Sequence, residues 1–148
     1  MPVYKSFSVE QTEKIGSELS KSLSGGAVVA LFGDLGMGKT TFVRGIVKGL
    51  GIEAPVSSPT FALVHEYGGN PAFYHFDMYR INSWDGLYST GFFDYLNENS
   101  ILAIEWSENI ENALPKNHIK VEFEYGHELN ERIITITERE EEHENSCN

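Results

Sequence analysis

The segment AVVALFGDLGMGKTT, residues 27–41, decides the fold. It opens with the apolar run AVVALF, residues 27–32, whose length and valine content predict a strand buried on both faces. A helix is predicted from Lys39 to Leu50, because apolar side chains recur along it at helical spacing and Gly51 stands where a left-handed residue commonly ends a helix. The glycine-rich stretch GDLGMGKT, residues 33–40, joins the two. A buried strand, a glycine-rich turn and a helix in this order favour an α/β protein.

The turn matches the phosphate-binding pattern G-x-x-x-x-G-K-[ST], the P-loop or Walker A motif, at Gly33, Gly38, Lys39 and Thr40. The glycines let the backbone curl so that its N–H groups face phosphate oxygens, and the start of the helix adds partial positive charge. We expect the Lys39 ammonium to contact the β- and γ-phosphates and the Thr40 hydroxyl to be a Mg²⁺ ligand. A turn that binds nothing is the weaker alternative, because the strand and helix that the motif requires are both present.

A P-loop site needs a second magnesium anchor, usually an acid at the end of a neighbouring buried strand. Two acids compete for this role. Glu105 ends the apolar run ILAI, residues 101–104, and Asp77 lies within AFYHFDMYR, residues 72–80. Glu105 is the favoured anchor, although either acid could instead be a structural carboxylate at a strand end whose hydrogen bonds are made within the protein.

The remaining periodicity predicts a mixed sheet. An amphipathic helix over residues 9–23 is capped by Ser8, and short helices are expected within 84–99 and over 109–114. Two β-hairpins are predicted, one pairing residues 61–68 with 72–80 and the other pairing 118–126 with 131–138. A further strand, buried on both faces, is predicted over residues 101–106.

Size and charge limit the function. The chain has 148 residues and a net charge of −11, which fits one domain, residues 1–138, and argues against autonomous nucleic-acid binding. Residues 139–148 form an acidic segment that we expect to be disordered. The single cysteine, Cys147, excludes an internal disulfide. No apolar run has the length of a membrane span or a signal peptide, so we expect a soluble cytoplasmic protein.

Few cations are available to the site. Of the arginines, Arg44, Arg80, Arg132 and Arg139, only Arg80 is expected to reach it, as a catalytic group or as the ion-pair partner of an acid. Arg44 is expected to point to solvent. His75 precedes Asp77 by two residues and so shares its strand face, where a packed, hydrogen-bonded role is favoured over a chemical one.

Four segments, in this order and spacing, resemble the TsaE (YjeE) family of small P-loop ATPases: GDLGMGKTT, SSPTFALVHEY, FYHFDMYR and IEWSE. The resemblance covers residues 8–138, with Met37 where the family commonly has alanine. It implies a P-loop NTPase-like three-layer sandwich with a mixed sheet.

The resemblance also implies roles for individual residues. Lys39 and Thr40 would hold phosphates and Mg²⁺, Glu105 would be the second metal anchor, and Asp77 would be needed for hydrolysis. Ser58-Pro59-Thr60 would form a switch near the γ-phosphate. The nucleotide-binding residues would be Gly33, Asp34, Gly36, Met37, Gly38, Lys39, Thr40, Thr41 and Trp106.

The implied function is a Mg²⁺-dependent ATPase that resets the TsaD–TsaB complex which forms threonylcarbamoyladenosine beside the tRNA anticodon. The net charge of −11 and the single arginine expected near the site predict that the isolated chain is a weak ATPase and contacts tRNA only through the complex. A small-molecule P-loop kinase is one alternative, although such enzymes usually carry several arginines. A non-hydrolysing, nucleotide-gated interaction module is another. A GTPase is disfavoured because the sequence has no [NT]-K-x-D segment.

Overall fold

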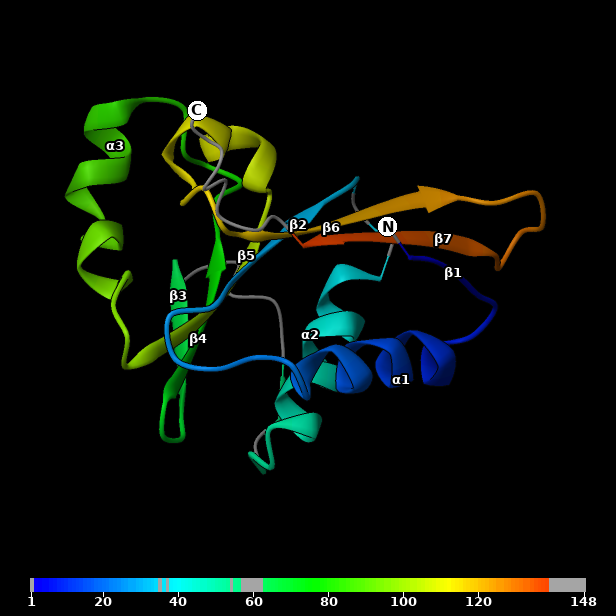
Figure 1. Ribbon diagram of the computed structural model, residues 1–148. Coiled ribbons are helices and arrows are strands. Elements are labelled where there is room, and N and C mark those ends of the chain that lie inside the picture. The colour runs from blue at the N-terminus through cyan, green and yellow to red at the C-terminus, as the bar shows by residue number, and fades with distance from the viewer. Residues whose placement is uncertain (1, 35, 37, 54, 57–62, 139–148) are drawn as a thin grey trace, which may run out of the picture.

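The computed structural model describes residues 2–34, 36, 38–53, 55–56 and 63–138, which build one seven-stranded sheet in the order β1-β7-β6-β2-β5-β4-β3 (Figure 1). The predictions for Met37, for Ser58-Pro59-Thr60 and for residues 139–148 lie outside these residues. The strands are β1 (Val3–Ser6), β2 (Val28–Phe32), β3 (Val64–Gly68), β4 (Ala72–Asp77), β5 (Ser100–Glu105), β6 (Ile119–Tyr125) and β7 (Arg132–Glu138). The helices are α1 (Val9–Ser20), α2 (Lys39–Gly49), α3 (Trp84–Ser89) and the 3₁₀ helices η1 (Phe92–Tyr95) and η2 (Ser107–Ala113).

The centre of the sheet is parallel. Strand β2 lies between β5 and β6 and runs parallel to both, and β4 runs parallel to β5. Every residue of β2 and β5 is buried, as their continuous apolar runs predict. The two predicted hairpins are also confirmed, since β3 pairs with β4 and β6 pairs with β7 in antiparallel fashion.

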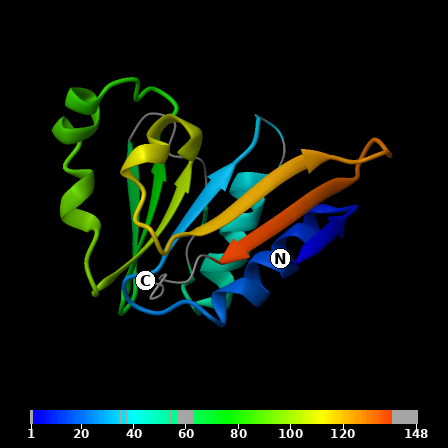
Figure 2. The same cartoon turned by 45° about the horizontal axis from the view of Figure 1, so that its top comes forward.

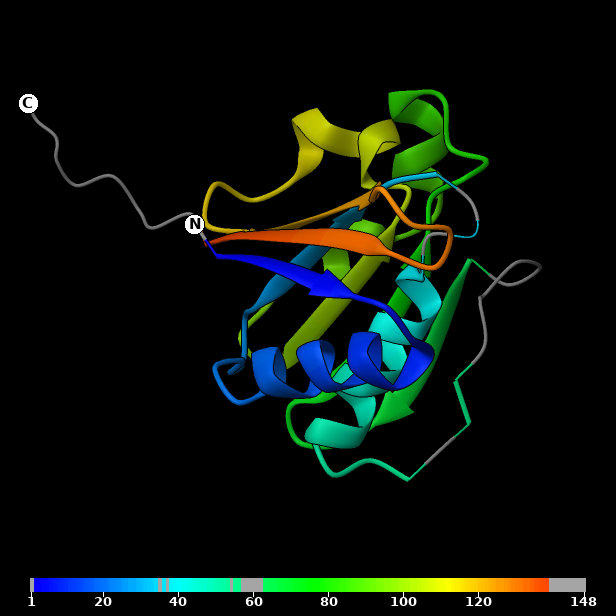
Figure 3. The ribbon, with the colours of Figure 1, turned by 90° about the vertical axis from the view of Figure 1, so that its right-hand side faces the viewer.

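Helices cover both faces of the sheet, which confirms the three-layer α/β architecture. Helices α1 and α2 lie on one face, and α3, η1 and η2 lie on the other (Figure 3). Each layer boundary contains its own apolar core, one around Phe42 and Phe73 and the other around Phe76 and Phe92. Among the described residues, no helix combines the length and apolar character needed to cross a membrane.

Helices α1 and α2 approach each other closely enough for their backbones to touch. A Cβ atom added to Gly16 would lie 2.3 Å from the Phe42 carbonyl oxygen, and one added to Gly45 would lie 2.0 Å from the Glu13 carbonyl oxygen. Glu13 also accepts hydrogen bonds from Arg44 (3.2 Å) and Lys48 (2.8 Å). The expectation that Arg44 points to solvent is therefore wrong, because the partly exposed guanidinium pairs with the neighbouring helix.

Strand β4 ends at Asp77, three residues before the predicted end at 80, and two further elements differ from the sequence prediction. Helix α1 ends at Ser20, three residues before the predicted end at 23, and its C-cap is Lys21. Strand β1 has no counterpart in the prediction. It pairs with β7 at the sheet edge, and only Ser6 of its four residues is buried, so it carries no alternating pattern to detect (Figure 2).

Gly45→Ala should destabilise the protein, because the new methyl group would meet the Glu13 backbone and overpacking of this kind costs about 1–3 kcal/mol. Gly86→Ala in α3 is the matched control, since its Cβ would meet only Ser83 Oγ, at 3.2 Å. Urea unfolding should show a lower free energy of unfolding for Gly45→Ala alone. Equal stability of the two variants would contradict the backbone contact.

Candidate functional site

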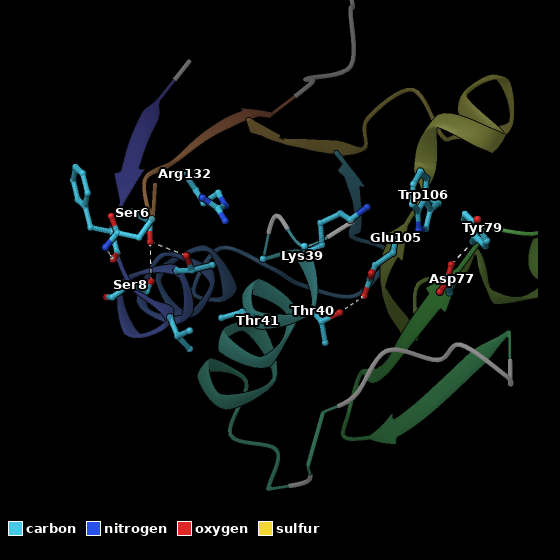
Figure 4. Close-up of a pocket in the computed structure, with 16 residues that line it drawn as sticks. Ser6, Ser8, Lys39, Thr40, Thr41, Asp77, Tyr79, Glu105, Trp106 and Arg132 are labelled. Atoms are coloured by element: carbon cyan, nitrogen blue, oxygen red, sulfur yellow. Dashed lines mark hydrogen bonds between the residues drawn. The ribbon is translucent and has the colours of Figure 1, made fainter. Parts of the chain in front are cut away.

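A cavity of about 810 Å³ opens at the carboxyl ends of the parallel strands, where ligands commonly bind in open α/β sheets (Figure 4). Its lining comes from both ends of the described chain: Ser6, Phe7, Ser8, Val9, Thr12, Gly36, Gly38, Lys39, Thr40, Thr41, Asp77, Tyr79, Glu105, Trp106, Asn130 and Arg132. Figure 4 shows Arg132, Ser6 and Ser8 at one end, Glu105, Asp77 and Trp106 at the other, and Lys39 between them.

The start of α2 forms the floor of the cavity. Its N-cap, Gly38, has φ 96°, a left-handed conformation that favours glycine, and no side-chain hydrogen bond caps the helix. The first N–H groups of the helix therefore lack the side-chain partner that most helices have. An uncapped helix start beside a cavity fits a phosphate group, since it combines hydrogen-bond donors with the positive end of the helix dipole.

Lys39 is buried, with 4% of its surface exposed. Its ammonium donates to the Gly33 carbonyl oxygen and lies 4.1 Å from the centroid of the Trp106 ring. Burial lowers the pKa of Lys39, while the negative charges of Glu108, Glu105, Asp77 and Asp34 act against that shift. Carboxylates around the Lys39 ammonium repel a bare polyanion. The arrangement therefore suits a polyanionic ligand that arrives with a metal ion, because the ion neutralises part of the negative charge.

Thr40 and Glu105 provide adjacent oxygen ligands. The Thr40 hydroxyl donates to Glu105 Oε2 across 3.0 Å, which joins the first turn of α2 to the end of β5. Mg²⁺ prefers hydroxyl, carboxylate and water oxygens and usually retains several waters, so this donor pair fits the ion. Asp77 ends β4 as the register partner of Glu105, and its Oδ1 accepts from the Tyr79 N–H (2.9 Å). Both competing acids thus face the same cavity, and the Thr40 hydroxyl donates to Glu105.

Trp106 follows β5 in a strained conformation. Its φ of 60° and ψ of 41° are left-handed values, which are uncommon for a bulky residue and often mark functional sites. The conformation ends β5, starts η2 and places the indole between Lys39 and Tyr79, whose ring centroid lies 5.0 Å away. The indole therefore lies beside Lys39, and its role in nucleotide binding stays a prediction.

The far end of the cavity corrects the expectation about arginines. Arg80 is exposed and is not among the lining residues, whereas Arg132 lines the cavity and stacks on Tyr125, with 4.7 Å from its Cζ atom to the ring centroid. Asn130 in the β6–β7 turn donates to the Phe7 carbonyl oxygen (2.9 Å) and so ties the hairpin to the start of α1. Arg132 was missed because only antiparallel pairing of β6 with β7 brings its end of the strand to the cavity.

Glu108 is a second residue that sequence reasoning missed. Its Oε2 accepts a hydrogen bond of 2.9 Å from the N–H of Gly33, the first glycine of the motif. It lies in the segment IEWSE, and its position three residues after Glu105 was the available signal.

Fold and site together define a P-loop protein with a mixed sheet. The family model for "Threonylcarbamoyl adenosine biosynthesis protein TsaE" matches residues 6–134, and the chain belongs to the TsaE family.

Individual relatives agree with the family model. The tRNA threonylcarbamoyladenosine biosynthesis proteins TsaE of Haemophilus influenzae and Bacillus subtilis are 46% and 35% identical to this chain, over 66% and 90% of its length. The matched stretches span 63% and 84% of those two proteins. The crystal structure of Bacillus subtilis YdiB superposes with a TM-score of 0.75 at 31% identity, covering 94% of this chain and 86% of that one.

Addition of Mg²⁺ and ATP should change the fluorescence of Trp106, because Lys39 would leave the indole face to reach phosphate. Trp84→Phe is the matched control, since the other tryptophan lies on α3 and packs on Phe93. Trp84→Phe should retain the change and Trp106→Phe should lose it. A signal that survives Trp106→Phe would place the ligand elsewhere.

Proposed function

We propose that this protein binds and hydrolyses ATP with Mg²⁺, as a component of the apparatus that makes threonylcarbamoyladenosine in tRNA. The observation that carries the proposal is the convergence of Lys39, Thr40, Glu105 and Asp77 on a single cavity. Membership of the TsaE family, whose curated relatives are named for threonylcarbamoyladenosine biosynthesis, supplies the pathway.

Each residue has a role in the proposed reaction. The loop from Gly33 to Gly38 and the start of α2 hold the phosphates, and Lys39 contacts the β- and γ-phosphates. Thr40 and Glu105 would hold Mg²⁺, which when bound neutralises charge on the phosphate oxygens. Asp77 would orient the attacking water, because it lies beside Glu105 at the end of the adjacent strand but does not share its bond to Thr40.

Partner proteins are expected to complete the activity. Phosphoryl transfer is aided by cations around the transferred group, and Arg132 lies at the end of the cavity away from Glu105 (Figure 4). The net charge of −11 also disfavours direct binding to tRNA. TsaD and TsaB homologues are the proposed partners, and ATP hydrolysis would reset their complex between turnovers.

Substitutions should separate the roles of phosphate, metal and water contacts in calorimetry with ATP. Lys39→Ala should weaken binding about tenfold to a hundredfold, the loss expected for a charge-assisted contact, whereas Lys48→Ala at the exposed end of the same helix should not. Thr40→Ala and Glu105→Ala should make binding less dependent on magnesium. Asp77→Ala should bind normally and lose turnover.

Two results would contradict these assignments. Unchanged ATP affinity in Lys39→Ala would contradict the assignment of the phosphate-binding site. Loss of magnesium dependence in Asp77→Ala but not in Glu105→Ala would reverse the roles of the two acids. Normal function of Asp77→Ala in the full complex, despite its lost turnover, would instead favour a nucleotide-gated module that does not need hydrolysis.

ATP hydrolysis should be slow for the chain alone and faster with TsaB and TsaD homologues. Cations supplied by a partner accelerate other P-loop enzymes by roughly 10³–10⁵, so a rise of at least about tenfold is expected here. Transfer RNA alone should have little effect. A high rate for the isolated chain, or strong stimulation by tRNA without partners, would favour an autonomous enzyme.

A further inference from the structure

A buried histidine lies directly behind the Glu105 carboxylate. His75 is fully buried on β4, in register with Ala103 of β5. Its Nε2 atom lies 2.6 Å from Glu105 Oε2. The small side chain at Ala103 leaves room for the imidazole to extend along the sheet toward the next residue on that face, Glu105.

Two donors converge on the same carboxylate oxygen. Oε2 of Glu105 accepts from Thr40 of α2 at 3.0 Å and from His75 of β4 at 2.6 Å, and neither bond uses Oε1. Thr40 is itself expected to bind the metal, so its hydroxyl cannot be relied on to orient the carboxylate once the ion is present. His75 is not expected to bind the metal, so it can keep its hydrogen bond to Glu105 both before and after the ion binds.

The imidazole directs its hydrogen bonding to this single acceptor. Among the described residues, Nδ1 of His75 has no partner, so the Nε2 bond to Glu105 is what offsets the cost of burying a polar ring. Tyr67 of β3 lies beside the ring, with centroids 6.5 Å apart and planes 29° apart. Phe73 and Phe76 on the same strand are fully buried apolar residues, so space filling alone does not require an imidazole at position 75.

We infer that His75 is a positioning residue for the magnesium site: it donates Nε2–H to Glu105 Oε2 and fixes the carboxylate in the orientation that faces Thr40. The inference rests on the proposed function, because it requires Glu105 to hold Mg²⁺. Hydrogen-bond partners behind a metal ligand typically change metal affinity 10–100-fold when they are removed, which sets the size of the expected effect.

Two amide substitutions test the role with nearly constant polarity. The His75→Gln side chain places its NH₂ near the position of Nε2, whereas the His75→Asn side chain is one methylene shorter and does not reach Glu105. Calorimetry would measure ATP binding over a range of Mg²⁺ concentrations and also in EDTA, and thermal unfolding would check the fold.

His75→Asn should raise the Mg²⁺ concentration needed for half-maximal enhancement of ATP binding by about tenfold or more. His75→Gln should stay within about threefold of the wild type, and affinity in EDTA should be equal in all three proteins. His75→Leu, which keeps volume without a donor, replaces the asparagine variant if that variant does not fold, and the same shift is expected.

Wild-type magnesium dependence in His75→Asn or in folded His75→Leu would overturn the inference and leave His75 as a packing residue. An equal loss of affinity in EDTA would also overturn it, since the cavity itself would then be disturbed. If ATP binding by the wild type ignored Mg²⁺, the proposed metal site would fail and this inference with it. If the wild type depended on magnesium and the variants did not differ from it, the inference about His75 would be wrong and the proposed metal site would stand.

Discussion

One carboxylate oxygen, Oε2 of Glu105, connects three elements of the fold. It accepts hydrogen bonds from Thr40 at the start of α2 and from His75 on β4, while Glu105 itself ends β5. These bonds can form only because β4 and β5 are parallel and in register, which brings both strand ends to one level beside the helix. The central parallel pairing is therefore the constraint on which the site depends, and the remaining elements close the cavity around it.

Several polar groups of the site pair with one another. Lys39 bonds to the Gly33 carbonyl oxygen, the Gly33 N–H bonds to Glu108, and Thr40 bonds to Glu105. Buried polar groups are costly when unpaired, so this mutual pairing stabilises the protein when no ligand is present. A phosphate group entering the cavity must exchange these bonds for its own, which makes the net gain on binding smaller than the number of contacts suggests.

Sequence patterns predicted the parts of the fold that depend on burial or on a local motif. The runs at 27–32 and 101–106 were assigned correctly because strands covered on both faces must be apolar throughout. Strand β1 was missed because it is exposed and is held by pairing to β7, a long-range effect that its own residues do not encode.

The same distinction applies to the site. The loop residues and the acids Asp77 and Glu105 follow from a motif and from strand ends. The structure places Gly36, Gly38 and both acids on one cavity, whereas Gly33 and Asp34 are not among its lining residues. Arg132 was assigned to a strand end but not to the cavity, and Arg80 was preferred, because proximity in sequence to Asp77 says nothing about which way an exposed side chain turns. The hydrogen bond of His75 to Glu105 required the register of two strands that are far apart in the chain.

The glycine contacts between α1 and α2 affect how binding energy is used. Helix α1 begins at one end of the cavity and the start of α2 forms its floor, and backbone packing at Gly16 and Gly45 holds the two helices together. Contacts between backbones have no rotamers to vary, so the position of that end relative to the floor fluctuates little. The entropy lost in assembling this part of the cavity is therefore lost when the chain folds, and a ligand that contacts both helices meets a preorganised surface.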